Sequence, residues 1–303
     1  MDNQEAYHVP VMLNEVLEAL NIRSDGTYVD CTFGGGGHSS EILRRLGSRG
    51  RLIAFDQDED AKKNLPDDPR LVFVPHNFRH ISRFLRLHKA LPVDGVLADL
   101  GVSSFQINTP ERGFSTRFEG HLNMRMDKGR DYTAADVLNG MTEEDLQKMF
   151  QNYGEVTNAR TLAASIVRAR VLKPFRTLSD LNFVLQPIAK GNPQRYFAQV
   201  YQAIRIEVND EMNALKDLLN QLPEVLAPKG RMAIITFHSL EDRLVKNFFR
   251  YENVEGVRHT DEFGHAQASR IKVISKKPVL PSKQELENNP RSRSAKLRVA
   301  EKI

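Results

Sequence analysis

Apolar runs alternate with amphipathic segments along the first third of the chain. The apolar runs occupy residues 28–33, 51–56, 70–75 and 94–101. The intervening segments with helical spacing of apolar residues are 38–47, 58–65 and 80–91. Near-continuous apolar strands that alternate with helices are typical of a parallel sheet covered on both faces. Right-handed crossovers bring the carboxyl ends of such strands to one edge, and we expect any ligand there.

This pattern stops at about residue 105. From there to residue 200 the sequence predicts helices and no strand, over 142–154, 158–172, 178–191 and 195–206. Thr142 precedes Asp145 by three residues, which is the spacing of an N-cap. The alternation of helices and strands then returns. Helices are predicted over 209–230 and 239–249, and strands over 231–237, 270–279 and 295–303. The helix over 239–249 is expected to begin with a Ser239/Asp242 capping pair. We therefore predict an α/β core in two parts, residues 1–105 and 201–303, interrupted by a helical insertion over 106–200.

Four consecutive glycines follow the first predicted strand. Gly34 to Gly37 lie between the run that ends in Asp30 and the next helix, and Asp56 closes the second strand 19 residues after Gly37. Backbone N–H groups at a helix start bind nucleotides, and an acid at about this distance accepts hydrogen bonds from ribose hydroxyls. The order predicts a nucleoside site, and the alternative is a glycine-rich turn beside an exposed acid.

The residues around the glycines narrow the choice of cofactor. The dinucleotide pattern G-x-G-x-x-G fails, because Ser39 or Ser40 stands where its third glycine belongs. Asp30 would repel a pyrophosphate and would face a positive group instead. S-adenosylmethionine carries a sulfonium and an ammonium and no phosphate, so the sequence favours it over NAD, and an NAD-linked oxidoreductase is the enzymatic alternative. For His38 and Phe78 the sequence leaves two roles open, which are contact with this cofactor and an ordinary structural role.

Polar residues follow the fourth and fifth apolar strands at the same predicted edge. Asp99 and Ser103 are expected to face the reactive side of the cofactor, and Gln106 is expected to reach back to it. In the alternative, Asp99 caps a turn. His238 follows the 231–237 strand and either contacts the target base or organises the start of a helix. An amine acceptor must lose a proton during methyl transfer, and Asp99 or nearby carbonyls are the candidate acceptors.

Composition and charge limit the partners and the cellular compartment that we expect for this protein. The chain of 303 residues has a formal net charge of +4 and a pI of about 9.1, which permits a nucleic-acid partner. Basic residues gather over 112–125, 160–176 and 291–298, where they either follow phosphates or form solvated faces. Cys31 is the single cysteine, which suits a reducing compartment. Without an apolar run of roughly 18 residues or a metal-ligand motif, we expect a cytoplasmic protein with no membrane partner and no metal.

Six blocks in one order resemble a known family. VDCTFGGGGHS, DLGVSSFQ, ERGFS with NMRMD, QAIRIEVNDE, FHSLEDR and NPRSRSAKLRVAE are similar to the bacterial 16S rRNA cytosine-N4 methyltransferase (MraW-type) family, from about His8 to Glu301. The resemblance implies a class I, Rossmann-like, S-adenosylmethionine-dependent fold with a helical insertion after the fourth strand. It implies N4-methylation of a cytidine in the decoding (P-site) region of 16S rRNA in the small ribosomal subunit. Because the helical insertion follows a strand end, we expect it to be an RNA substrate domain.

The resemblance also implies functional residues, position by position. The cofactor contacts fall on Gly36, Gly37, His38, Asp56, Phe78, Asp99 and Gln106. The catalytic candidates come from their places after the fourth and fifth apolar strands, and they are Asp99, Ser103 and His238. Asn123 stands where the family often has Asp, so no catalytic role is assigned there. An alternative from another class is a non-catalytic RNA-binding or ribosome assembly factor that retains a nucleoside pocket.

Overall fold

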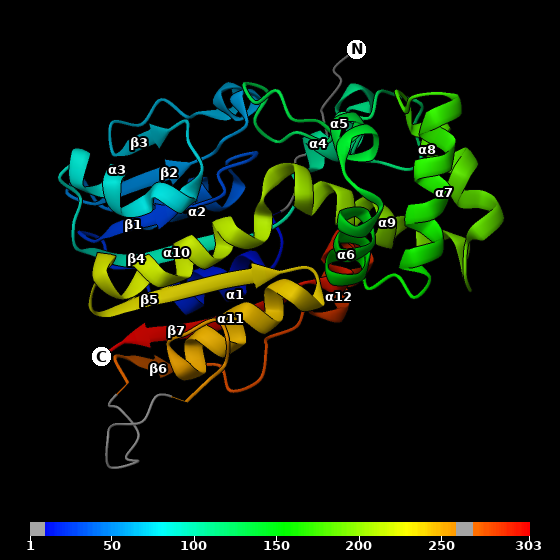
Figure 1. Cartoon of the computed structure of the whole chain (residues 1–303). Helices are drawn as coiled ribbons and strands as arrows, with labels where there is room; N and C mark the ends of the chain where they lie inside the picture. The colour runs from blue at the N-terminus through cyan, green and yellow to red at the C-terminus, as the bar shows by residue number, and fades with distance from the viewer. Residues whose placement is uncertain (1–9, 259–268) are drawn as a thin grey trace. The chain divides into compact units, whose positions relative to one another are not determined.

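The computed structural model describes residues 10–258 and 269–303, and the chain divides into two compact units (Figure 1). The core unit comprises the described residues up to Gly101 and from Asn213 onward, and the helical unit comprises Val102–Met212. The second boundary lies later than the predicted position at 200, because the helix from Pro193 to Asn209 is continuous and buries Ile204 and Val208 within the helical unit. Among the described residues, no helix is both long and apolar enough to cross a membrane.

The core unit is built on a seven-stranded sheet in the order β3-β2-β1-β4-β5-β7-β6. The strands are β1 Thr27–Asp30, β2 Arg51–Phe55, β3 Leu71–Val74, β4 Val93–Asp99, β5 Leu226–Thr236, β6 Ile271–Val273 and β7 Lys296–Lys302. The first five in spatial order are parallel, and β7 runs antiparallel to both β5 and β6. The strand order reverses direction between β1 and β4. The predicted doubly wound sheet is confirmed, with its switch point at these two central strands.

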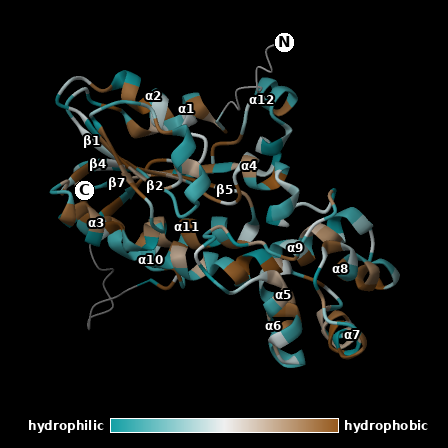
Figure 2. Ribbon diagram, turned by 90° about the horizontal axis from the view of Figure 1, so that it is seen from above, coloured by the Kyte–Doolittle hydropathy of each residue, from teal (hydrophilic) through white to brown (hydrophobic). Residues whose placement is uncertain are grey.

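Helices cover both faces of this sheet. The helices of the core unit are α1 Leu13–Leu20, α2 Gly37–Arg45, η1 Glu59–Asn64, η2 Phe78–His80, α3 Ile81–Leu87, α10 Glu211–Val225, α11 Ser239–Tyr251, α12 Lys283–Asn288 and η5 Pro290–Ser294. Successive residues of a strand point to opposite faces. In β4, Val96 and Ala98 pack with α3, α10 and α11, whereas Leu97 packs with α1 and α2. Figure 2 shows apolar residues gathered on the strands, as a sheet buried on both faces requires.

The helical unit is formed by α4 Ser104–Asn108, η3 Pro110–Arg112, α5 Ala134–Gly140, α6 Glu143–Gly154, α7 Ala159–Leu172, α8 Leu178–Leu185, η4 Gln186–Ile188 and α9 Pro193–Asn209. Thr142 caps α6 as predicted, since its side chain accepts a hydrogen bond from the Asp145 N–H. Threonines also cap α5 and α8. The buried face of α9 forms much of the apolar core of this unit, with Val200, Ile204 and Val208 at a spacing of four residues.

Two predicted elements end at other residues in the structure. The helix predicted over 209–230 ends at Val225, and β5 already begins at Leu226, which pairs with Val93 before the register shifts at Gly95. The strand predicted over 270–279 is limited to Ile271–Val273. In both places, pairing to a neighbouring strand decides the element, and local spacing does not contain that information.

Gly95 provides a test of the packing at the centre of the sheet. A Cβ atom at this position would lie 2.8 Å and 2.9 Å from two atoms of the buried Tyr28 ring. We expect Gly95→Ala to lower the free energy of unfolding by about 1–3 kcal/mol, because the ring has no room to move. Urea unfolding followed by circular dichroism measures this change. Gly35→Ala is the control, since its Cβ would meet no atom within 4 Å, and equal midpoints for the two variants would contradict the expectation.

Candidate active site

The turn from β1 into α2 is bare of side chains at the switch point of the sheet. Gly34 and Gly36 have positive φ angles of 51° and 75°, which glycine adopts without strain. A Cβ on Gly36 would come within 2.9 Å of the Phe33 ring, so this position requires glycine for packing as well. In contrast, a Cβ on Gly35 would point into open space. The turn therefore presents exposed backbone at the edge where doubly wound sheets bind ligands.

Asp56 ties the end of β2 to this turn. Its carboxylate accepts a hydrogen bond from the Gly34 N–H at 2.7 Å and another from the Asp58 N–H at 2.8 Å. Burial raises the pKa of Asp56 to about 6, although both N–H groups act to lower it. The carboxylate is thus largely ionised at neutral pH, and its two oxygens have further lone pairs for ligand hydroxyls. The ribose-binding role that the 19-residue spacing predicts stays a prediction.

Asp30 was expected to face a positive ligand group, and the structure gives its carboxylate other partners. It is almost fully buried and accepts hydrogen bonds from the Ser39 hydroxyl at 2.7 Å and the Thr32 N–H at 3.0 Å. Asp30 therefore stabilises the turn from β1 into α2 through these hydrogen bonds. Its charge still acts on neighbouring groups, because it raises the pKa of Asp99.

Asp99 is the last residue of β4 and lies in a strongly acidic environment. Its backbone N–H donates to the Thr32 hydroxyl at 2.7 Å, which positions the residue beside the glycine turn. The Oδ1 atom is buried and has no hydrogen-bond partner among the described residues. Burial, followed by the charges of Asp30 and Glu241, holds the pKa of Asp99 well above its usual range. A buried acceptor without a partner is costly, and a cationic or hydrogen-bond-donating ligand group would satisfy it.

His38 connects α2 to the chain that precedes α1. Its Nε2 atom lies 3.0 Å from the carbonyl oxygen of Val11, and its Nδ1 atom lies 3.9 Å from Oδ2 of Asp99. Burial lowers the pKa of His38, so the imidazole is neutral at pH 7. The neutral ring donates from Nε2 to Val11, which leaves Nδ1 without a proton. His38 thus has a structural partner and also lies at the acidic end of β4.

Phe78 and His238 lie at the carboxyl ends of β3 and β5. Phe78 is half-buried at the start of η2, against the apolar core. His238 is the N-cap of α11, because its side chain accepts from the Glu241 N–H at 3.4 Å. The Glu241 carboxylate in turn accepts from the Phe237 N–H at 2.8 Å. The predicted Ser239/Asp242 capping pair is therefore wrong by one residue, and His238 has the helix-starting role named as its alternative.

Ser103 and Gln106 belong to the helical unit and pair with each other. The Ser103 hydroxyl accepts from the Gln106 N–H at 3.2 Å, and the Gln106 side-chain oxygen accepts from the Ser103 N–H at 3.0 Å. This capping box begins α4, and Gln106 is buried. Their assignments to catalysis and to cofactor binding stay predictions.

Several members of the basic clusters have structural partners. Arg298 is buried and bonded through Nε to the Asp242 carboxylate at 2.6 Å, with Lys296 3.5 Å from the same group. Arg112 is also buried and donates to the carbonyl oxygens of Arg125 and Met126. These side chains hold the fold together, so the clusters over 112–125 and 291–298 are not continuous phosphate-binding faces.

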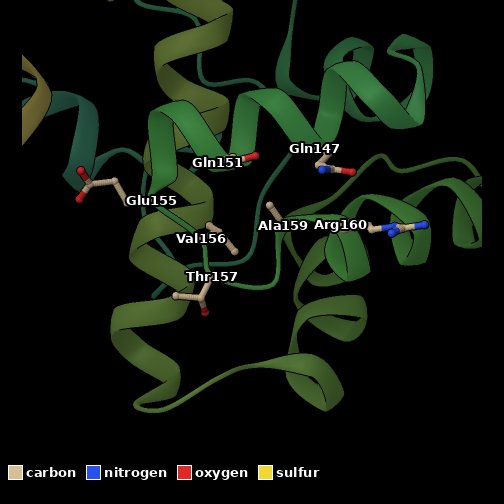
Figure 3. A pocket seen from close by; sticks show the side chains of 7 residues that line it. All are labelled: Gln147, Gln151, Glu155, Val156, Thr157, Ala159 and Arg160. Atoms are coloured by element: carbon tan, nitrogen blue, oxygen red, sulfur yellow. The ribbon is translucent and has the colours of Figure 1, made fainter.

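The helical unit has an open polar hollow between α6 and the start of α7. Figure 3 shows Gln147 and Gln151 along α6 and Arg160 on α7 around this hollow of about 440 Å³, with Thr157 and Glu155 at its rim. No spacing motif in the sequence indicates it. The amides and the guanidinium are groups that pair with nucleobase edges and phosphates.

The core unit is a doubly wound α/β sheet with a bare glycine turn and the carboxylates of Asp56 and Asp99 at its switch point, the place where sheets of this class bind ligands. The chain belongs to the MraW methylase family, which matches residues 5–303. It is 52% identical to ribosomal RNA small subunit methyltransferase H of Parabacteroides distasonis over 304 residues, covering 100% of this chain and 99% of that protein. The proteins of the same name from Bacteroides thetaiotaomicron and Flavobacterium johnsoniae are 52% and 51% identical over 98% of this chain, and 97% and 98% of their own lengths are covered.

Asp56 should make cofactor affinity depend on pH. If ribose hydroxyls donate to the ionised carboxylate, the affinity for S-adenosylhomocysteine should be full above a pH of about 6 and should fall as the pH drops through that value. Asp56→Ala removes charge-assisted hydrogen bonds and should weaken binding about ten- to a hundredfold at neutral pH, with a shallower pH profile. Calorimetric titrations between pH of about 5 and 7.5 measure both effects.

Asp25→Ala is the matched control for this titration. Asp25 is an exposed acid of the core unit, with its side chain 58% exposed. Its loss should leave both the affinity and the pH profile unchanged. If Asp56→Ala binds S-adenosylhomocysteine with wild-type affinity, Asp56 does not bind the ribose.

Proposed function

We propose that this chain transfers a methyl group from S-adenosylmethionine to N4 of a cytidine in the decoding (P-site) region of 16S rRNA. Membership of a methylase family supports the reaction type. The observation that carries the proposal is the unpartnered, buried Oδ1 of Asp99 beside the bare glycine turn, because it calls for a cationic or donating group. A cytoplasmic setting, which the single buried Cys31 suits, is part of the proposal.

The residues at the switch point fit this cofactor chemically. Asp56 would hold the ribose hydroxyls, and Asp99 would neutralise a positive group of the methionine part. Phe78 would lie against the adenine, and Gly36, Gly37 and His38 would allow close contact with the backbone. When bound, S-adenosylmethionine supplies a methyl group activated by its cationic sulfur. The carboxylates of Asp30, Asp56 and Asp99 around one turn would repel a pyrophosphate, which disfavours NAD.

The protein's own task in the reaction is to orient the target amine and accept its proton. An exocyclic cytosine amine is a weak nucleophile, so a nearby acceptor on its N–H bonds helps the reaction. Asp99 is the first choice, since its raised pKa makes the ionised form a stronger base than an ordinary carboxylate. His238 and Ser103 are second choices, because both already have capping roles.

The helical unit is proposed to hold the RNA substrate. Arg160, Arg168 and Arg176 are exposed on this unit, and the polar hollow beside Arg160 offers amide groups to a base. RNA-modifying enzymes present an unstacked base to the active site and need contacts with the flanking nucleotides. A non-catalytic assembly factor would share such a surface, so only a test of methyl transfer separates the two functions.

Methyl transfer can be tested on the expected substrate. Small ribosomal subunits from cells that lack this protein should accept labelled methyl groups from S-adenosylmethionine in the presence of the purified chain. Mass spectrometry of nucleosides from a nuclease-protected fragment of the decoding region should then find N4-methylated cytidine. Subunits from cells that contain the protein are the control and should accept little label. Binding of subunits without any transfer would favour the assembly factor, and label on another base would reject the N4 assignment.

Asp99 has two proposed roles, and steady-state kinetics separate them. Asp99→Asn keeps the size of the side chain but cannot take up a proton. If Asp99 accepts the proton, kcat at saturating cofactor should fall by at least about a hundredfold in both Asp99→Asn and Asp99→Ala. If Asp99 only holds the cofactor, KM for S-adenosylmethionine should rise while kcat is maintained, and the proton-accepting role would be wrong.

A further inference from the structure

A second hollow, of about 680 Å³, lies on the surface of the core unit where η2 and α3 meet α10. Its lining includes Arg79, His80, Arg83 and Arg86, together with Leu87, which is 68% exposed. No motif in the sequence indicates it, and neither the predicted cofactor contacts nor the catalytic candidates fall on these residues. The hollow starts one residue after Phe78, so it begins at the carboxyl end of β3.

The floor of this hollow is held rigidly. The Gln221 side chain on α10 accepts from the Ser82 N–H at 3.1 Å and donates to the Arg79 carbonyl oxygen at 2.8 Å. The Arg79 guanidinium is bonded to the Asp217 carboxylate at 2.6 Å and 2.9 Å, which fixes η2 against α10. The backbone of η2 and the first turn of α3 is therefore positioned before any ligand arrives.

The charge on this surface is not balanced. Arg83 and Arg86 lie three residues apart on α3, a spacing that places them on one helix face, and Arg79 precedes them in η2. Arg79 has its partner in Asp217, whereas Arg83 and Arg86 are exposed and form no ion pair with any described residue. Like charges three residues apart destabilise a helix. Some exposed cations of this unit have adjacent acids, such as Arg44 with Glu41 and Lys63 with Asp60.

We propose that Arg83 and Arg86 bind backbone phosphates of the RNA substrate outside the helical unit. The inference rests on the proposed function, since it assigns a second contact surface to the same substrate. Two unpaired guanidiniums on a fixed helix match a polyanion, because each forms bidentate hydrogen bonds with a phosphate. The exposed Leu87 adds an apolar contact for a ribose or a base. The hollow begins at the sheet edge that carries the proposed cofactor site, which the target base has to reach.

The salt dependence of binding tests this proposal directly. Filter binding of unmethylated small subunits, at fixed magnesium and several potassium chloride concentrations, gives the slope of log K against log salt. Arg83→Gln/Arg86→Gln should bind roughly tenfold more weakly, and its slope should be shallower by about 1.4–1.8, which corresponds to two lost phosphate contacts. KM for subunits should rise with kcat unchanged. Arg83→Lys/Arg86→Lys keeps both charges and should retain the steep slope.

The control variant removes two arginines from another part of the core unit. Arg45→Gln/Arg49→Gln changes exposed residues near the amino end of β2 and lowers the net charge by the same amount. It should bind small subunits like the wild type. An equal loss of affinity in both double variants would show that the net charge alone causes the effect, and would overturn the proposal. Unchanged affinity and slope in Arg83→Gln/Arg86→Gln would also overturn it, as expected for an acidic protein partner. If the wild-type protein binds small subunits but transfers no methyl group, the proposed function is wrong, whereas the effect of Arg83 and Arg86 on binding is still valid.

Discussion

The hydrogen bond from the Gly34 N–H to the Asp56 carboxylate is the contact on which the site depends. It joins the end of β2 to the turn after β1 at 2.7 Å and holds an ionisable oxygen against bare backbone. Beneath it, Asp30 bonds Ser39 and Thr32, and the Thr32 hydroxyl accepts from the Asp99 N–H. Three strand ends are thus linked through carboxylates and one hydroxyl. The turn is preorganised because backbone N–H groups hold the Asp56 carboxylate and the Thr32 hydroxyl holds the backbone of Asp99.

This concentration of acids has an energetic cost, which the rest of the core unit must offset. Burial raises the pKa of both Asp56 and Asp99, and the charge of Asp30 raises that of Asp99 further. The two apolar clusters on the faces of the sheet stabilise the fold enough to tolerate such groups at its edge. A ligand with hydroxyl donors and a positive charge would relieve this unfavourable state, and an anionic ligand would worsen it. The burial of these carboxylates therefore favours ligands of the first kind.

Local sequence patterns predicted the sheet, the glycine turn and Asp56, because each depends on near neighbours or on one short crossover. They failed where a partner distant in the sequence determines the contacts of a residue. Asp30 bonds a serine nine residues later, and Asp242, expected to cap α11, bonds Arg298 across 56 residues. Glu241 was missed as the cap of α11 because the neighbouring Ser239/Asp242 pair has the same three-residue spacing, and its action on Asp99 was missed because the two residues are distant in the sequence. The end of α10 and the start of β5 were likewise set by pairing with β4.

The arginines show why the positive charge in a sequence does not locate a binding surface. The RSRSAKLR block looks like the strongest basic cluster, yet Arg298 is buried against Asp242 and Lys296 lies near the same carboxylate. Arg112 in the loop after β4 is buried among carbonyl oxygens. Such guanidiniums are buried and bonded within the fold, so they cannot form close contacts with a polyanion, whereas exposed arginines without acids can. Only the three-dimensional pairing of charges therefore distinguishes arginines that stabilise the fold from those available to RNA.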